Sequence, residues 1–469
     1  MKKIVVILSL LNLFVLTACL NHSSHIYNVL DYGAVGDGVT DDAEAIQRAI
    51  DECSESGGGK VLFPGGYTFM SGPLHLASFI DFHIDTNTVL IANPDECIYQ
   101  ESAFKDNKRE GMLWLSAKNV EGLTISGRGE INGNGVSFMG KELEDSYELK
   151  PVHTVDPRPH LLTIIGGRNI NIKDVTIKNS AYWTVHLVGC EDVVIHGITL
   201  LNDLKVRNGD GIDLDHSKNV RISDCLIESG DDCICLKNRR EYDEYGACEN
   251  IVVTNCTMTS RSCAIKIGSE NVDRISHVMV NNCIIKDSNR GIGIQNRDEG
   301  TVEDIVFSNI WVDCRFFSDV WWGKAEPIYI TAYPRARGDH KDAGWRFPKG
   351  VKDGFVGQVS HIFFSNIKCE SENGIFVGGE SKDKIQNIYF DQVDLLICKR
   401  TDYPRGFYDK RPCKGEAFVF APVSGFFLDT ATGITIRNAS VRWGDTGCPE
   451  WGSNIEQRNV AGLNLSNVK

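Results

Sequence analysis

Two short acidic motifs, Asn208-Gly209-Asp210 and Gly230-Asp231-Asp232-Cys233, have the residue types and spacing to carry out chemistry. Their first aspartates, at positions 210 and 231, are 21 positions apart in a region of repeating short strands. If each repeat forms one turn of a coil, Asp210 lies beside the Asp231–Asp232 pair of the next turn. Crowded like charges are costly, so three gathered carboxylates indicate acid–base chemistry or a bound cation. Acid–base cleavage of a glycosidic bond uses such a group.

The same residues have other common uses, because Asp and Gly are frequent in turns and clustered aspartates bind calcium. Two matched motifs on adjacent coils favour the catalytic interpretation, so we predict no metal ion and no cofactor. Neighbours on a regular strand face opposite sides, so Asp231 and Asp232 need a bend, which Gly230 and the glycines around Asp210 allow. Asp213 has the outward parity of the following strand, and it either contacts the substrate or is simply solvated.

The motifs lie inside a repeat that begins near Val120. Each copy has apolar residues at alternate positions, then a polar step, then a second short strand, as in residues 169–177 and 219–227. The polar steps fall at positions 174, 197, 224, 255, 282, 309, 366 and 392, and the one interval of 57 residues indicates an extra turn or an inserted loop. Such a period, with alternating strands and no helices between them, predicts an all-β solenoid.

The exposed end of such a stack needs a cap. Residues 41–50 carry apolar side chains at helical spacing and acidic side chains in the first turn, which predicts a capping helix with Thr40 or Asp41 as its N-cap. The glycines at 57–59 end this helix and lead into a strand at 60–64.

Length and composition narrow the class of protein. The chain has 469 residues, and repetitive β folds often exceed the usual domain size, so we predict one domain over residues 28–469 and a monomer. The net charge of −14 argues against nucleic acid as a partner, but it does not exclude an anionic sugar as a substrate. Of the 16 cysteines, Cys225, Cys256 and Cys283 match in successive repeats and are expected to stack as core residues. Pairing among Cys398, Cys413 and Cys448 stays open.

The first residues have the layout of a secretory signal: Lys2 and Lys3, an apolar run too short to span a bilayer, and small residues before Cys19. This resembles a bacterial lipoprotein signal over residues 1–19, in which Cys19 receives the lipid, followed by a tether at 20–27. An ordinary signal peptide is the alternative. The pattern predicts an exported protein that a lipid anchors to the cell envelope, facing the periplasm or at the cell surface.

Residues 31–42, the following helix and the glycines at 57–59 resemble the opening of pectin-degrading parallel β-helix enzymes. The two acidic motifs resemble the first two signature motifs of glycoside hydrolase family 28, the polygalacturonase family. The resemblance implies a single-stranded right-handed parallel β-helix and an inverting hydrolase. It also implies that Asp231 is the general acid and that Asp210 and Asp232 hold the water.

The next two coils depart from the family pattern. Ser262 stands where the family has a histidine, and Gly293 and Gln295 stand where it has the arginine and lysine that bind the galacturonate carboxylate. A cation facing a carboxylate is the expected recognition element for a uronic acid. The departures therefore leave polygalacturonan in question as the substrate, while the acid–base group is intact. Gln295 remains a candidate for contact with the sugar.

Four other basic residues could bind an acidic sugar: Lys237, Lys266, Arg290 and Arg297. Alternation with Ile265 and Ile267 points Lys266 outward, whereas for each of the others an ordinary solvated coil residue is the favoured interpretation.

An aromatic stretch at 319–327 could form a wall against which sugars stack, with Trp322 as the platform and Glu326 bonding to hydroxyls. Packing of this loop on the solenoid is the alternative. Trp183 and His186, on the coil before Asp210, are weaker candidates for the edge of the cleft.

These patterns predict an inverting hydrolase that acts on a pectic or related acidic polysaccharide or oligosaccharide. Inserted segments at 102–110, 139–159 and 333–356 favour attack at a chain end, because they could close the groove. A polysaccharide lyase that uses calcium and a basic residue is one alternative. A non-catalytic glycan-binding solenoid is another.

Overall fold

The structure, a computed structural model, describes residues 25–105, 109–142, 149–151, 157–318, 321–335, 354–444 and 451–469. The signal at 1–19 with Cys19, and the tether up to residue 24, lie outside the described residues and stay predictions. Across the described ranges, no helix has both the length and the apolar character needed to cross a membrane.

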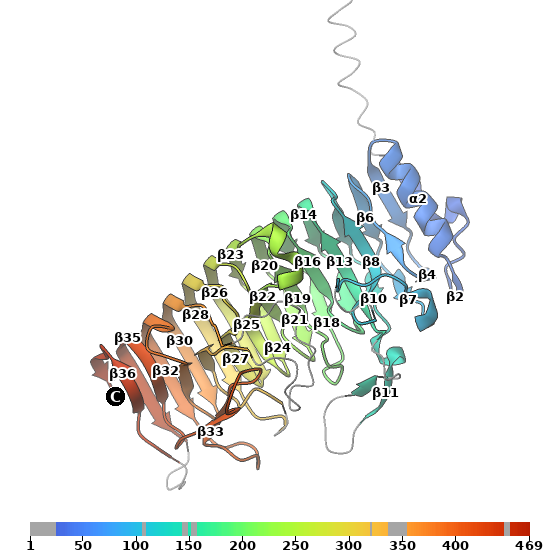
Figure 1. Ribbon diagram of the computed structural model, residues 1–469. Coiled ribbons are helices and arrows are strands. Elements are labelled where there is room, and N and C mark those ends of the chain that lie inside the picture. Colours follow the sequence, from blue (N-terminus) through green and yellow to red (C-terminus); the bar gives the residue numbers. More distant parts are fainter. Residues whose placement is uncertain are drawn as a thin grey trace, which may run out of the picture.

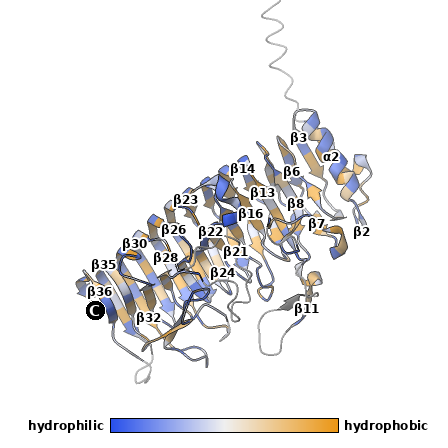
Figure 2. Ribbon diagram, viewed as in Figure 1, coloured by the Kyte–Doolittle hydropathy of each residue, from blue (hydrophilic) through white to orange (hydrophobic). Residues whose placement is uncertain are grey.

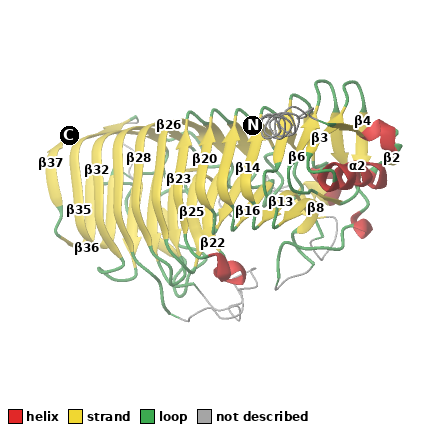
Figure 3. Ribbon diagram, turned by 90° about the horizontal axis from the view of Figure 1, so that it is seen from above, coloured by secondary structure: helices red, strands yellow, loops and turns green. Residues whose placement is uncertain are grey.

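The chain winds into one long right-handed parallel β-helix, which runs from the α2 end to the C-terminal strands (Figure 1). Its strands form three parallel ladders along the axis, and Figure 3 shows their strands side by side from above. The predicted fold class is confirmed.

The first ladder contains β1 (Ile26–Asn28), β3 (Gly59–Phe63), β6 (Ile80–Ile84), β9 (Thr124–Gly127), β14 (Arg168–Lys173), β17 (Glu191–His196), β20 (Lys218–Ser223), β23 (Cys248–Thr254), β26 (Ile275–Ser288), β28 (Val302–Cys314), β30 (Val359–Ser371), β32 (Ile385–Ile397), β35 (Phe426–Trp443) and β37 (Asn464–Val468). The second contains β2 (Asp37–Asp41), β4 (Thr68–Ser71), β7 (Val89–Ala92), β10 (Glu130–Asn132), β15 (Thr176–Lys178), β18 (Thr199–Leu201), β21 (Leu226–Ser229) and β24 (Thr257–Ser260), and it continues through the later parts of β26, β28, β30, β32 and β35.

The third ladder carries the candidate site. It contains β5 (Leu74–His75), β8 (Met112–Lys118), β13 (Pro159–Ile165), β16 (Val185–Val188), β19 (Ile212–Asp215), β22 (Ile234–Asn238), β25 (Cys263–Asn271), β27 (Arg290–Asn296), β29 (Ile328–Ala332), β31 (Ile375–Gly379), the start of β35, and β36 (Ile455–Ala461).

Elements outside the ladders are few in the described chain. They are the helix α2 (Ala43–Glu55), the 3-10 helices η1 (Val29–Tyr32), η2 (Glu96–Ile98), η3 (Gly135–Phe138) and η4 (Arg240–Tyr245), and two antiparallel pairs, β11 (Met139–Glu142) with β12 (Leu149–Pro151) and β33 (Phe407–Asp409) with β34 (Phe418–Phe420).

The interior is a stack of aliphatic side chains from alternate strand positions. One column runs from Ile170 through Val193, Val220 and Ile251 to Val278, each in register with the next and at most 2 % exposed. Hydrophobic and hydrophilic residues alternate along the strands in Figure 2. Burying each such side chain stabilises the fold by about 1.5–3 kcal/mol, so the repeated pattern drives the coiling.

The predicted polar steps are the bends between the first and second ladders. All eight residues have left-handed backbone angles, with φ between 54° and 63°. Asn, Asp and Gly adopt this conformation at low cost, which explains their recurrence. Because β28 pairs directly with β30, the long interval after Asn309 contains an inserted loop and no extra coil.

Helix α2 covers the N-terminal end of the stack with Ile46, Ile50 and neighbouring small residues, as predicted. Its N-cap position is Asp42, one residue later than the sequence indicated. Asp41 still accepts a hydrogen bond from the Ala43 amide at 2.9 Å, whereas Asp42 accepts from the amides of Val35 and Gly36.

No disulfide joins two cysteines within the described ranges. Cys225, Cys256 and Cys283 are at most 3 % exposed and belong to the main core, as predicted. Cys398 Sγ lies 3.8 Å from Glu370 Oε1 and Cys413 Sγ lies 3.6 Å from the Glu416 carbonyl oxygen, whereas Cys448 lies outside the described residues.

Candidate active site

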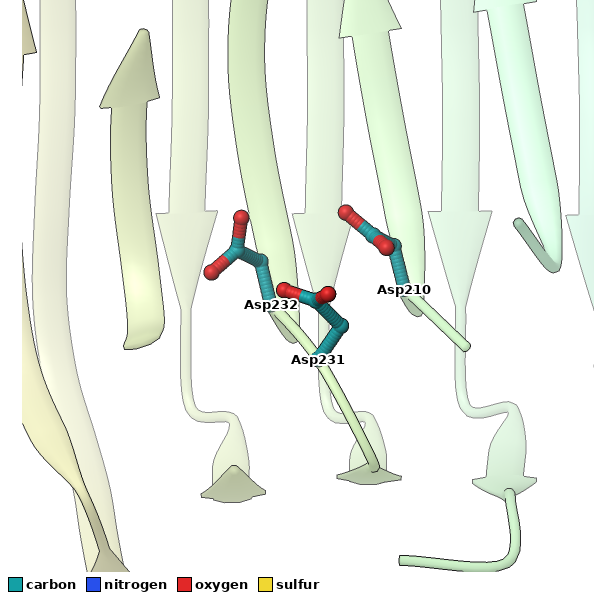
Figure 4. A group of neighbouring side chains, drawn as sticks. All are labelled: Asp210, Asp231 and Asp232. Atoms are coloured by element: carbon teal, nitrogen blue, oxygen red, sulfur yellow. The ribbon is translucent and has the colours of Figure 1, made fainter. Parts of the chain in front are cut away.

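Asp210, Asp231 and Asp232 converge at the starts of two neighbouring strands (Figure 4). Asp210 precedes β19, and the other two precede β22, the next strand of the third ladder. One carboxylate oxygen from each residue lies within 4.8 Å of the others. The three residues are 3 %, 7 % and 1 % exposed, respectively. The sequence spacing therefore brings three carboxylates into one enclosed site.

Glycines permit this arrangement through close approach of the coils. A Cβ atom on Gly211 would lie 2.4 Å from the Cys233 carbonyl oxygen, and one on Gly230 would lie 2.3 Å from the Val206 carbonyl oxygen. Neither glycine has a positive φ, whereas Asn208 does, at 55°. The turn therefore comes from Asn208, and the glycines are needed for space, which differs from the predicted role.

The carboxyl groups have different surroundings. Asp232 accepts hydrogen bonds from Ser262 Oγ at 2.9 Å and Lys266 Nζ at 2.7 Å, one on each oxygen. Asp231 accepts one from the Asn208 amide at 3.3 Å. Asp210 Oδ1 is buried without a hydrogen-bond partner, and burial, then the nearby Asp231, raises the pKa of Asp210 well above its ordinary value. Asp232 thus faces the Lys266 ammonium, whereas Asp210 favours its protonated form.

Lys266 lies where alternation placed it, outward between Ile265 and Ile267 on β25. Its side chain is 15 % exposed and contacts a catalytic candidate directly. Burial alone would lower the pKa of the Lys266 ammonium, but the acidic groups around it, Asp232 foremost, together raise it above its ordinary value. Lys266 therefore supplies a fixed positive charge inside the acidic cluster.

Replacing Lys266 by Met is expected to lower kcat/KM by about 10–100-fold, because Asp232 loses a charge-assisted hydrogen bond of 2.7 Å. Lys266→Arg keeps the positive charge and should largely restore the rate. Initial rates on pectic oligosaccharides measure the loss, and a Lys266→Met variant within a few-fold of the wild type would contradict this role.

Asp213 and Lys237 form a buried ion pair next to Asp210. Asp213 is fully buried and pairs with Lys237 Nζ at 2.6 Å, and Lys237 also lies 3.7 Å from the centroid of the Trp183 ring. Burial alone would lower the pKa of the Lys237 ammonium, but the acidic groups around it, Asp213 foremost, together raise it. The sequence allowed Asp213 to line the cleft or to be solvated, and both placements are wrong. His186, bonded to Asp215 at 3.4 Å, is equally buried.

Arg290 and Glu326 form a two-pronged ion pair, with distances of 3.2 and 3.0 Å. The Arg290 guanidinium also lies 3.7 Å from the centroid of the Tyr329 ring and donates to the Trp322 carbonyl. Glu326 is fully buried and Arg290 is 4 % exposed. The prediction that Glu326 bonds to sugar hydroxyls is wrong, because both of its carboxylate oxygens accept hydrogen bonds from Arg290. Trp322 is partly exposed, so stacking on a sugar stays a prediction.

Gln295 and Arg297 are bound to the segment that carries β33. Gln295 Nε2 donates to the Arg411 carbonyl at 2.5 Å, and Arg297 donates to the Lys410 carbonyl at 2.8 Å. Arg297 is fully buried and Gln295 is 2 % exposed. Neither side chain is placed to contact a sugar in this structure, because the inserted segment covers both.

An insertion closes the N-terminal side of the site. Phe104 packs edge-on against His160 and Trp183, with ring centroids 5.3 Å apart in both cases. The segment is anchored by a hydrogen bond from the Tyr242 hydroxyl, on η4, to the Ala103 carbonyl. His160 is fully buried beneath these rings. The segment around Phe104 therefore covers the outward side of β13 and β16.

A second insertion closes the C-terminal side. Tyr329, Phe376 and Phe427 point outward from successive coils and are fully buried against Tyr408 of β33. The Tyr329 hydroxyl donates to the Asp409 carbonyl at 2.6 Å. The outward face of the third ladder is thus covered by protein at the coil of β29, the one after Gln295. The predicted insertion at 102–110 takes part in closure, whereas those at 139–159 and 333–356 lie largely outside the described residues.

The sequence patterns did not identify Arg158, which supports the turn before Asp210. Arg158, fully buried, donates to the carbonyls of Ala181 and Arg207 and to Asn208 Oδ1 at 3.2 Å, which supports the turn before Asp210. Arg158 precedes β13 without belonging to the repeat, so periodicity gave no signal for it.

The family model for glycosyl hydrolases family 28 matches residues 53–314. The chain is 31 % identical over 301 residues to a probable polygalacturonase of Vitis vinifera, covering 59 % of this chain and 58 % of that protein. It is 29 % identical over 367 residues to a probable polygalacturonase of Arabidopsis thaliana, covering 75 % and 70 %. The match spans less than two thirds of the Vitis vinifera relative's length.

Among solved structures, the family 28 exopolygalacturonase of Yersinia enterocolitica superposes with a TM-score of 0.69 at 18 % identity, covering 95 % of this chain and 78 % of that one. The polygalacturonase of Erwinia carotovora gives a TM-score of 0.56 at 20 % identity, covering 93 % and 95 %. These likenesses establish the fold.

Proposed function

The chain belongs to glycosyl hydrolases family 28, and we propose that it cleaves single units from the end of a pectic or related acidic polysaccharide or oligosaccharide, with inversion. The observation that carries this proposal is the enclosed group of three carboxylates, of which Asp232 pairs with the Lys266 ammonium at 2.7 Å and Asp210 favours a proton. Acid–base cleavage of a glycosidic bond requires one carboxyl group that carries a proton and one that is ionised. Different surroundings of the carboxyl groups produce this difference.

In this mechanism Asp231 donates a proton to the leaving oxygen, and Asp232 with Asp210 accepts from the attacking water. In the free enzyme, burial and the nearby Asp231 favour the proton on Asp210. The proton must reside on Asp231 when the sugar is bound, which leaves Asp210 ionised. Asp231 is the most exposed of the three and therefore the best placed to reach the glycosidic oxygen.

The spacing of the carboxylates bears on the stereochemistry. Oxygens within 4.8 Å are closer than the separation of about 6.5–9.5 Å common in inverting enzymes, and nearer to the 5–5.5 Å or so of retaining ones. We propose inversion because the third carboxylate gives the water a second acceptor, so the water need not lie across a wide gap. The family resemblance supports the same outcome.

Protein packed on both sides of the carboxylates supports attack at a chain end. Phe104 and Trp183 fill one side, and Tyr408 with its aromatic neighbours fills the other. A long polymer running through the site would have to displace both packed clusters. A chain end or a short oligosaccharide needs only the enclosure between them.

The proposal predicts one small product from the earliest time points, of inverted configuration. Pectic oligosaccharides and polymers would be incubated with the enzyme with and without chelator, products separated by chromatography, and the first-formed anomer identified by NMR. A ladder of products would refute chain-end attack, and a retained anomer would refute inversion. Chelator-sensitive formation of an unsaturated product would indicate the lyase, and binding without cleavage would indicate the glycan-binding solenoid.

A further inference from the structure

A hollow of about 380 Å³ lies on the second ladder, away from the three carboxylates. It is lined by residues of β26, β28 and β30, at and just after the left-handed bends that lead from the first ladder into the second. Ile284, Trp311 and Lys368 form its wall, because they lie in register on three successive coils and are all exposed. Trp311 is three coils beyond the coil of Asp231, about 14 Å along the axis.

The apolar side chains of this wall depart from the repeat. Ile284 is 49 % exposed and Trp311 is 44 % exposed. On the neighbouring coils the same outward position holds mostly polar residues: Thr176, Thr199, Leu226, Thr257, Lys368, Asp394 and Ser440. Two large apolar side chains next to each other in water contribute little to the core, so they indicate a surface that binds a ligand.

A row of amides runs beside these side chains at the hollow. Asn309 Nδ2 donates to Asn282 Oδ1 at 3.2 Å, and Asn366 Nδ2 donates to Asn309 Oδ1 at 2.8 Å. All three residues are exposed. Each amide nitrogen has two hydrogens and each amide oxygen accepts two hydrogen bonds, so the row keeps donors and acceptors for a ligand.

Lys368 places a positive charge at the end of the wall. Its Nζ lies 4.5 Å from the centroid of the Trp311 ring. Among the described residues, no carboxylate lies within ion-pair distance of this ammonium. Asp394 on the next coil is affected by the Lys368 charge, but its hydrogen bonds come from Ser440 at 2.6 Å and Arg442 at 3.0 Å. The Lys368 ammonium can therefore contact a carboxylate of a ligand.

An acidic polysaccharide fits these groups better than a protein does. Amides bind sugar hydroxyls, an indole ring packs against the apolar face of a sugar, and an ammonium binds a uronic carboxylate. The two apolar side chains provide far less contact than the roughly 800 Å² that each partner buries in a stable protein complex. We propose that the hollow at Ile284, Trp311 and Lys368 is a second saccharide-binding site, which holds the body of an acidic polysaccharide on the outside of the solenoid. The ligand class rests on the proposed function.

Such a site complements a catalytic site that admits only a chain end. Protein covers the third ladder on both sides of the carboxylates, so the body of a polymer needs another place to bind. A polymer held at the hollow raises the local concentration of chain ends, because enzyme and polymer stay associated between cleavages. This effect lowers KM for long substrates and leaves short ones unaffected.

The test measures binding to the polymer separately from cleavage. Asp231→Asn protein would be run through native gels that contain polygalacturonate or neutral dextran, with and without Trp311→Thr and Lys368→Gln. The two substitutions together are expected to weaken binding to polygalacturonate by 10-fold or more, with no retardation by dextran in either protein. Tyr67→Ala, which removes a ring that is 38 % exposed at the other end of the solenoid, is the matched control and should bind as before.

Kinetics of the active enzyme provide the second readout. With Trp311→Thr and Lys368→Gln, KM for polygalacturonate should rise about 3–10-fold at unchanged kcat, whereas kcat/KM for trigalacturonate should stay the same. Thr stands at this position on three other coils, so the Trp311 substitution suits the strand. Ile284→Thr, which copies Thr257 of the preceding coil, is an independent variant with the same expected direction.

The outcomes separate this inference from the proposed function. A loss of polygalacturonate binding in the variants supports the second site even if no substrate is cleaved. Equal retardation of variant and parent protein overturns it, whatever the activity. A protein that sediments as a dimer without sugar and becomes monomeric with Trp311→Thr also overturns it, because a second copy of the chain then covers the hollow.

Discussion

Asp231→Asn is expected to lower kcat on the cleaved substrate by about 10²–10⁴-fold, the usual contribution of a general acid. The amide keeps the shape of the side chain and the acceptor for the Asn208 amide, but it has no acidic proton to donate to the leaving oxygen. Release of reducing ends from pectic oligosaccharides measures the loss. Activity within a few-fold of the wild type would remove Asp231 from the mechanism.

Asp210→Asn provides the control for folding. Because the pKa of Asp210 is raised in the folded protein, folding favours its protonated form, and the stabilisation that this gives is complete only below about pH 4. It is lost as the pH rises through the folded pKa, so the ionised carboxyl opposes folding at neutral pH. The variant should therefore lose activity while unfolding no more easily than the wild type at pH 7. Its advantage should grow from pH 4 to 8 in denaturant titrations.

The solenoid was predictable because its physical cause repeats along the chain. Alternating aliphatic residues such as Ile170 and Ile172 must face one interior, and the polar residues between strands are those that tolerate a left-handed backbone. The spacing of Asp210 and Asp231 then follows from the coil. Their differing environments do not, because the partners of Asp232 come from the next coil.

The burial of Asp213 shows what alternation leaves undetermined. Parity assigns a side chain to the outer side of a strand, but it does not tell whether another segment covers that side. Here the cover includes Trp183 and, through it, Phe104 from an insertion far earlier in the chain. Gln295 is hidden for the same reason by the segment at Arg411. Insertions lack the repeat's pattern, so their docking sites could not be derived from it.

Glu326→Gln is expected to destabilise the protein by about 3–5 kcal/mol, because it leaves the Arg290 charge buried without its counter-ion. The pair is deeply enclosed, so water cannot replace the lost carboxylate oxygens that Arg290 contacts at 3.2 and 3.0 Å. The midpoint of guanidinium unfolding should fall with little change in slope.

The double variant Arg290→Met with Glu326→Leu separates charge from packing. Removing both charges avoids the unpaired ion, so its loss should be much smaller than the sum of the losses of the single variants. If the two single losses simply added, the ion pair would not be the source of the effect.

Because the Arg290 side chain crosses the space beside Gly293, the same variants would also show whether this pair shapes the wall of the enclosure. In that case the stable double variant should alter KM for the pectic substrate and leave kcat almost unchanged.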